Sequence, residues 1–247
     1  ISTVTSMPFS LYSTFVIEQR HGFNNQTIGL YFVDLLKSQL IMAVLMFPFM
    51  SAFLWIIKST GDNFFFYVWL IVMGFQLVII TVYPTFIQPF FNKLTPMEEG
   101  ELRTRIEELA ARISFPLKKL YVIDGSKRSG HSNAYFYGFG KNKHIVLYDT
   151  LIDHSNTDEI CAVLAHELGH WKMGHTLKLL AVNQVYLLSI FWLFSFFIHN
   201  KQLYQDFGFN TMPTLIGFML FQFIYSPIES VIGFLQHVYQ RKNEYEA

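Results

Sequence analysis

Charge is scarce in this chain, and neither sign of charge is in excess. Of its 247 residues only 15% are Asp, Glu, Lys or Arg, and 18 basic residues balance 18 acidic ones. Ordinary soluble domains carry about 25% charged residues. Without a basic surplus the chain lacks the electrostatic footprint of a nucleic-acid-binding protein, so no nucleic-acid partner is predicted. The scarcity of charge, together with 52% hydrophobic and 18% aromatic residues, indicates a membrane protein.

Cysteine is nearly absent as well, because Cys161 is the only one in the chain. A single cysteine excludes a disulfide within the chain and fits the reducing conditions of a cytosol-facing segment. Cys161 is predicted to be a small buried apolar residue and not a metal ligand. The chain also lacks a starting Met and stops at Ala247 within a predicted helix, so we expect it to be a fragment of a longer protein.

Long charge-free runs are the main feature that is present. A membrane-crossing helix needs about 20 apolar residues, and four runs have about that length or more: residues 40–57, 64–91, 179–198 and 207–228. Pro84 and Pro89 predict that the second run kinks or leaves the membrane near its end. The fourth run contains Pro227 and is followed by Glu229 and a further apolar stretch, which predicts a kinked span that continues past the membrane surface.

The distribution of basic residues predicts the orientation of these spans. Four spans place the segment before residue 40, the segment 92–178 and the segment after the fourth span on one side of the membrane. Sixteen of the 18 Lys and Arg residues lie on that side, and only Lys58 and Lys201 lie on the other. By the positive-inside rule, the side that carries residues 92–178 faces the cytosol.

The long segment between the second and third runs is predicted to be a compact α+β insertion. A helix is expected at residues 98–113, and three short strands are expected at residues 120–123, 132–139 and 144–148. An edge strand beside a metal site can pair with an extended peptide, and residues 131–138 are the candidate for that role. The alternative left open is that Tyr135, Phe136 and Tyr137 are simple packing residues.

Residues 166–170 read His-Glu-Leu-Gly-His, the pattern of a zincin metalloprotease. On a helix the two histidines lie one turn apart on the same face, so both imidazoles can reach one ion. Glu167 stands beside the metal without being a ligand, where a general base must stand to deprotonate a zinc-bound water. Asn156 and Glu159 form a capping box that opens this helix.

A catalytic zinc ion takes three protein ligands, so a third ligand is expected elsewhere. His175 follows His170 by five residues, about 140° around a continuous helix, and is therefore predicted to be an interfacial or capping residue. His131 and His144 remain weaker candidates. The acidic cluster Glu244-Tyr245-Glu246 near the end of the chain is the better candidate, although exposed glutamates near Lys and Arg usually form only a solvated face.

Five segments together resemble the type I CAAX prenyl endopeptidases, the integral-membrane zinc proteases of a-factor maturation and prelamin A processing. The segments are residues 10–18 with 21–24, then 131–139, 144–151, 165–176 and 241–247. They extend over almost the whole chain and are more specific than His-Glu-x-x-His alone.

Carried over residue by residue, the resemblance implies His166, His170 and Glu244 as ligands of one Zn²⁺ per chain and Glu167 as general base. It selects Glu244 over Glu246. It also implies that the strand with His131, Asn133, Ala134 and Tyr135 holds the substrate backbone. Family members have seven membrane helices around a water-filled chamber, so this chain is expected to hold four of the seven spans and to bind zinc poorly by itself.

The resulting fold prediction is a multi-pass α-helical membrane protein with a zincin-like α+β insertion. It has a membrane region at residues 1–91, a cytosolic segment at 92–155 and a third region at 156–247 that carries the zinc helix, two spans and the third ligand. The resemblance implies an endoplasmic reticulum membrane protein that removes the last three residues of prenylated CAAX proteins. Two alternatives remain open: a membrane quality-control zinc protease of the same clan, and a catalytically idle membrane scaffold.

Overall fold

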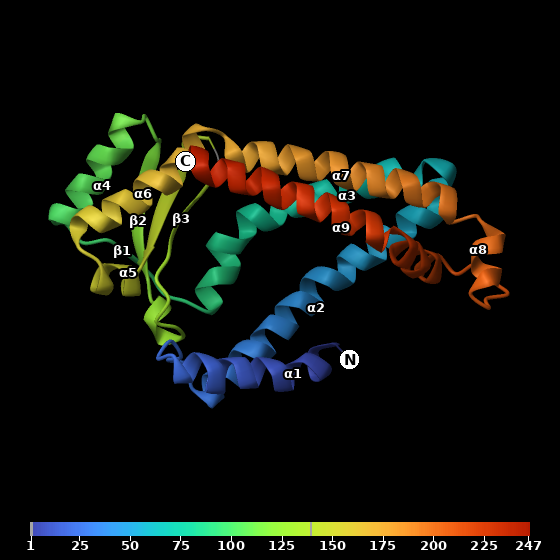
Figure 1. The fold of residues 1–247 in the computed structure, drawn as a ribbon, viewed down its shortest axis with the longest axis horizontal. Helices are drawn as coiled ribbons and strands as arrows, with labels where there is room; N and C mark the ends of the chain where they lie inside the picture. The colour runs from blue at the N-terminus through green and yellow to red at the C-terminus, as the bar shows by residue number, and fades with distance from the viewer. Residues whose placement is uncertain (1, 139) are drawn as a thin grey trace. The chain divides into compact units, whose positions relative to one another are not determined.

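The structure is a computed structural model that describes residues 2–138 and 140–247 (Figure 1). The chain forms two compact units. Unit 1 comprises Ile1–Ala43 and Ile80–Lys172, and unit 2 comprises Val44–Ile79 and Met173–Ala247.

Unit 1 begins with helices and contains all of the β structure. Its elements, in chain order, are α1 (Ser2–Tyr12) with the π-helical turn η1 (Ser13–Glu18), the first part of α2 (Ile28–Ser59), η3 (Tyr83–Ile87), η4 (Gln88–Phe90), β1 (Leu94–Pro96), α4 (Glu101–Arg112), β2 (Leu117–Ile123), η5 (Gly125–Lys127), β3 (Ala134–Tyr137), β4 (Lys143–Tyr148), α5 (Asp149–His154) and α6 (Thr157–Lys172).

The four strands form one mixed sheet in the order β1-β2-β4-β3. β2 runs parallel to β4, while β1 and β3 run antiparallel to their neighbours. Within the described residues β3 is therefore an edge strand, with Ala134 opposite Leu147 and Phe136 opposite Ile145. An edge strand leaves one row of backbone N–H and C=O groups without a sheet partner.

Helices α4 and α6 form a layer on one face of this sheet (Figure 1), because α4 packs against β2 and α6, and α6 packs against β3. The residues that fill the space between helices and sheet are almost fully buried. They include Ile106 of α4, Ile145 and Leu147 of β4, and Leu164 and Leu168 of α6. Burial of this apolar surface holds α6 at a fixed place beside the edge strand.

The sequence prediction for this segment is correct in kind and wrong in detail. The predicted helix 98–113 begins only at Glu101, because Gly100 is fully extended and precedes the first turn. The three predicted strands are present as β2, β3 and β4, but β1 was missed, since Leu94-Thr95-Pro96 is too short to show alternation. β3 is shorter than predicted, and Phe139 lies outside the described residues.

Unit 2 consists of helices. They are the remainder of α2, the turn η2 (Gly61–Asn63), α3 (Phe64–Val82, of which the last residues belong to unit 1), α7 (His175–Phe197), α8 (Lys201–Asp206) and α9 (Thr214–Glu246). α7 packs beside α9 (Figure 1). Aromatic residues dominate the core: Phe64 contacts Phe194 edge to face, and Phe194 in turn contacts Phe221.

Four helices in the described residues are long and apolar enough to cross a membrane, as predicted: Ile28–Ser59, Phe64–Phe90, His175–Phe197 and Thr214–Glu246. The second changes helix type at Tyr83, next to Pro84, in agreement with the expected disturbance there. The fourth was predicted to begin at residue 207, which is wrong, because residues 207–213 are turns and bends after α8 and the helix starts at Thr214.

Candidate metal centre

Helix α6 carries the His-Glu-Leu-Gly-His sequence, and its first turn is closed as predicted. Asn156 N–H donates to Glu159 Oε2 over 2.9 Å, and Glu159 N–H donates to Asn156 Oδ1 over 3.0 Å. This reciprocal capping box satisfies two of the backbone donors that a helix start leaves unpaired. Cys161 in the next turn is half-buried, less than predicted.

The two faces of helix α6 lie in different environments. Ile160, Leu164 and Leu168 follow one another at intervals of four residues and are each 1% exposed. His166 and His170 lie two residues from Leu168, about 200° around the helix, so their rings point away from this apolar core. Both histidines and Glu167 are half-buried.

The two imidazole rings face each other. Nε2 of His166 and Nε2 of His170 are 3.2 Å apart, and the ring centroids are 4.7 Å apart. Two nitrogens that bind one tetrahedral zinc ion at about 2.0–2.1 Å lie about 3.3 Å from each other. The spacing of the histidines therefore fits the donor set of such an ion.

Glu244, which the resemblance selects as the third ligand, lies in the last turns of α9 in unit 2, and its side chain is exposed. Two residues further on, the carboxylate of Glu246 lies 3.5 Å from His175 and 3.6 Å from Lys242. Two imidazoles and one carboxylate are a ligand set that catalytic zinc sites use.

His175 opens a new helix and does not continue the one that carries His166 and His170. Helix α6 ends at Lys172, and Gly174 adopts a left-handed conformation (φ 70°) before His175 opens α7. The predicted angle of 140° assumed a continuous helix, which is wrong. His175 is 1% exposed and occupies the first position of the new helix.

The edge strand β3 presents alternate residues to its free side. Tyr148 N–H donates to the carbonyl of Asn133 over 3.0 Å, so the Asn133–Tyr148 pair is hydrogen-bonded. Because hydrogen-bonded and non-hydrogen-bonded pairs alternate along an antiparallel ladder, the backbone groups of Ala134 and Phe136 point to the open edge. The Asn133 side chain covers part of this edge, since its Oδ1 accepts from Ala134 N–H over 2.8 Å.

The other residues predicted on this strand are engaged within the protein. His131 stacks on Phe23 with centroids 4.1 Å apart, and its Nε2 lies 2.9 Å from a carboxylate oxygen of Glu18. The hydroxyl of Tyr135 accepts a short hydrogen bond from the Gln88 side chain. Burial raises the pKa of Tyr135 to about 12, so its hydroxyl remains protonated.

Two residues that position the strand were missed by the sequence reasoning. Thr150, which is 3% exposed, donates from Oγ1 to the carbonyl of His131 over 3.0 Å. The side chain of Gln88, which is also buried, donates a hydrogen bond to the Tyr135 hydroxyl. Gln88 could have been found from the sequence, because it is a polar residue between Pro84 and Pro89 in an otherwise apolar run.

The chain matches two protein families over nearly its whole length. Residues 1–93 match the family described as CAAX prenyl protease N-terminal, five membrane helices, and residues 96–247 match peptidase family M48.

Several known proteins are similar to it. The CAAX prenyl protease 1 homolog of Homo sapiens is 42% identical over 285 aligned residues, which cover 100% of this chain and 60% of that protein. The homolog of Arabidopsis thaliana is 46% identical over 247 residues, covering 100% of this chain and 58% of that protein. The crystal structure of S. mikatae Ste24p matches 99% of this chain and 61% of its own, with a TM-score of 0.93 and 40% identity. This chain thus spans about 60% of the length of these relatives.

Proposed function

This chain belongs to peptidase family M48, joined to a CAAX prenyl protease N-terminal region, and we propose that its full-length protein is a zinc metalloendopeptidase that removes the last three residues of prenylated CAAX proteins. The observation that carries the proposal is the pair of His166 and His170 on α6, whose Nε2 atoms are 3.2 Å apart, with Glu167 next in sequence to one of them. A closed structural zinc site would have no use for an acid at that position.

Family membership implies a metal ion, and we propose that the ion is zinc, held by His166, His170 and Glu244. The two imidazole nitrogens and the carboxylate oxygen suit zinc, and three protein ligands leave the fourth position of a tetrahedral site open. When bound there, zinc supplies Lewis-acid chemistry, which lowers the pKa of water to about 7 and polarises a carbonyl group.

Glu167 acts as the general base in this proposal. Its carboxylate takes a proton from the attacking water and later delivers that proton to the nitrogen of the leaving amine. Its half-buried place on α6 fits the role, because α6 is fixed by the apolar stripe of Ile160, Leu164 and Leu168. A rigid helix keeps the base at a constant distance from the reacting atoms.

The peptide substrate is proposed to pair with the free side of β3. Backbone N–H and C=O groups of Ala134 and Phe136 point to that side by the hydrogen-bonding register, and Asn133 directly precedes the strand. Addition of an extended peptide as a further strand fixes the scissile bond by main-chain hydrogen bonds, whatever its side chains. The amide of Asn133 must move from Ala134 N–H when a substrate carbonyl takes that donor.

The membrane supplies the remaining context. The full-length protein is proposed to reside in the endoplasmic reticulum membrane with residues 92–178 in the cytosol, because 16 of 18 basic residues lie on that side of the four spans. A lipid bilayer and a prenylated CAAX protein are its partners in this proposal. The division into residues 1–91, 92–155 and 156–247 is kept as the functional organisation.

The experiment that tests this function uses the full-length protein in detergent. Hydrolysis of a farnesylated CAAX peptide is measured beside that of its unprenylated twin, with Glu167→Gln as the control and with zinc removed by a chelator and restored. Cleavage of only the lipidated peptide, lost in the variant and on chelation, is the expected result. Equal cleavage of both peptides would instead identify a general membrane protease, and no cleavage with zinc bound would identify a scaffold.

A further inference from the structure

A polar pocket lies within unit 1, and its lining includes neither His166 nor His170. It has a volume of about 450 Å³ and lies where α2, the segment after η4 and the η5 turn meet. Its lining includes four basic residues, Lys37, Lys93, Lys127 and Arg128, and one acidic residue, Asp124. Neither the proposed metal chemistry nor the proposed substrate strand uses this pocket.

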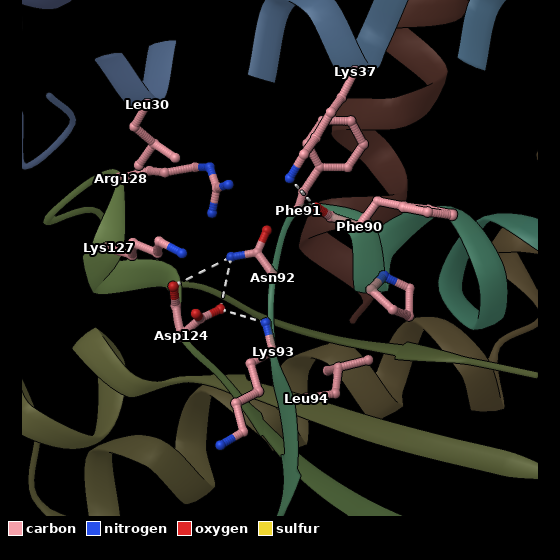
Figure 2. A pocket seen from close by; sticks show the side chains of 11 residues that line it. Leu30, Lys37, Phe90, Phe91, Asn92, Lys93, Leu94, Asp124, Lys127 and Arg128 are labelled. Carbon is pink, nitrogen blue, oxygen red and sulfur yellow. Dashed lines mark hydrogen bonds between the residues drawn. The ribbon is translucent and has the colours of Figure 1, made fainter. Parts of the chain in front are cut away.

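Three of the four basic side chains point toward one another (Figure 2). The side chains of Lys37, Lys127 and Arg128 extend toward the amide of Asn92, whereas the ammonium of Lys93 points away. We call this group of Lys37, Asn92, Lys127 and Arg128 the basic pocket. The charges come from α2 and from the end of η5, so sequence-distant segments bring them together.

The acidic residues nearby are already engaged by other groups. Asp34 accepts from Nε and Nη2 of Arg128 over 2.7 and 3.0 Å, and Asp124 accepts from Lys93 N–H and from the Asn92 amide over 2.7 and 3.0 Å. Three cations against these two carboxylates leave the basic pocket with a positive balance.

Arg128 also keeps an unused donor. Its Nη1 is buried and has no hydrogen-bond partner in the part of the chain that the structure describes. A buried guanidinium nitrogen without a partner is costly, and an oxygen of a bound anion is the acceptor that would satisfy it. Among the described residues the ammonium of Lys37 has one acceptor, the carbonyl of Phe90 at 2.8 Å, whereas an ammonium group carries three donors.

The position of the basic pocket along the chain places it at the end of two membrane spans. Lys37 precedes the charge-free run 40–57 by three residues, about 4.5 Å along the helix. Asn92 follows the run 64–91 directly. Phe90, which also lines the pocket, is 61% exposed and offers an apolar surface beside the charges. Basic pockets at the membrane surface between spans bind anionic lipid headgroups.

We propose that the basic pocket binds the phosphate group of an anionic ligand, and that a phospholipid headgroup is the source its membrane-surface position favours. Arg128 Nη1 and the ammonium groups of Lys37 and Lys127 contact the phosphate oxygens, and an acyl chain lies along Phe90. This site holds a lipid as a bound component and takes no part in peptide hydrolysis.

The test is binding of short-chain phosphatidic acid to the full-length protein in a neutral detergent, followed by native mass spectrometry. The double substitution Lys37→Gln with Lys127→Gln removes two charges, and at about fivefold per lysine it weakens binding about 25-fold. Lys93→Gln removes a neighbouring charge that points away and changes binding less than twofold. Lys37→Arg with Lys127→Arg retains binding.

Two further measurements complete the test. One distinguishes a lipid headgroup from free phosphate as the ligand, and the other replaces a variant that does not fold. Inorganic phosphate that displaces phosphatidic acid at equal concentration would support the site with free phosphate as its ligand, while retention of the lipid supports the headgroup. Lys127→Gln alone, which leaves the Lys37–Phe90 bond in place, replaces the double variant if that variant does not fold. Unchanged binding in the charge-removing variants, or an equal loss in Lys93→Gln, would overturn the proposal.

Discussion

At the scale of single residues, Glu167 is the side chain on which the proposed hydrolysis depends most directly. Glu167→Gln preserves size and hydrogen-bonding capacity but removes the proton acceptor. The rate of cleavage should fall by about 10² to 10⁴, the range that general acid–base catalysis contributes. Zinc content, measured by elemental analysis, should stay at the wild-type level. Loss of zinc together with activity would make Glu167 a ligand instead.

The two glutamates near the end of α9 offer a matched pair. Glu244 is the proposed third ligand, while Glu246 lies beside His175 and Lys242. Glu244→Gln should weaken zinc affinity by more than about 100-fold, beyond the effect typical of residues that only support a ligand. Glu246→Gln should leave zinc affinity unchanged. A competition titration with a chromogenic chelator measures both, and a reversed order would assign the ligand to Glu246.

His144 should make the stability of unit 1 sensitive to acid. Burial first, and then Lys118 and Lys119, lower the pKa of His144 in the folded chain. The unfolded chain, with an imidazole pKa of about 6.5, therefore binds a proton more readily than the folded one. The resulting stability is present above pH about 6.5 and is lost as the pH falls through the lower folded-state pKa.

His144→Gln should therefore flatten the dependence of the melting temperature on pH below pH about 6.5. Thermal unfolding in detergent at a series of pH values is the measurement. His154→Gln, a substitution of an exposed histidine at the end of α5, is the control and should leave the wild-type profile. Parallel profiles for wild type and His144→Gln would show that another group titrates.

At the scale of elements, the turn that joins β3 to β4 depends on one glycine more than on its neighbour. Gly138 and Gly140 both have positive φ, 109° and 55°. A Cβ at Gly138 would lie 1.9 Å from the carbonyl oxygen of Asn142, whereas a Cβ at Gly140 has nothing within 4 Å. Gly140→Ala should cost about 1 kcal/mol of unfolding free energy, and Gly138→Ala several times more.

Displacement of β3 should also appear in catalysis. Because the proposed substrate pairs with β3, Gly138→Ala should raise KM for the peptide, while Gly140→Ala leaves it unchanged. Chemical denaturation and steady-state kinetics on the same two proteins provide the two readouts. Similar costs for both substitutions would mean that the Asn142 carbonyl can move aside.

The elements that sequence could predict are those with a strong local signal. The capping box of Asn156 and Glu159 and the apolar runs are local, and the structure has both. β1 could not be predicted, because three residues ending in proline form a strand only when β2 lies beside them. The end of α6 depends on Gly174, and its left-handed conformation separates His175 from the helix that carries His170.

The residues of the candidate site also divide into those that a local sequence pattern predicts and one that it does not. The relation of His166, Glu167 and His170 follows from helical periodicity, so residues four apart could be placed together without a structure. Glu244 is 74 residues beyond His170 in the chain, and local periodicity says nothing at that separation. It was selected by family resemblance, and its role as the third ligand is a proposal.

At the scale of the whole molecule, the distribution of basic residues predicts which segments face the cytosol. Lys141 lies in the turn before β4, and Lys201 begins α8 between the third and fourth spans. In a Cys161→Ser background, Lys141→Cys should react with a membrane-impermeant maleimide in sealed microsomes. Lys201→Cys should react only after the membrane is permeabilised. Labelling of Lys201→Cys in sealed vesicles would reverse the topology.

The open side of β3 has a cost for the molecule that carries it. Unpaired backbone groups at a sheet edge can pair with any extended chain, including another copy of the same strand, and such edges are where sheets begin to aggregate. Here the edge is only four residues long, and Gly138 breaks it at one end while the Asn133 side chain occupies a donor at the other. The shortness of the strand and the cap that Asn133 forms on its own edge therefore protect the protein from unwanted self-association.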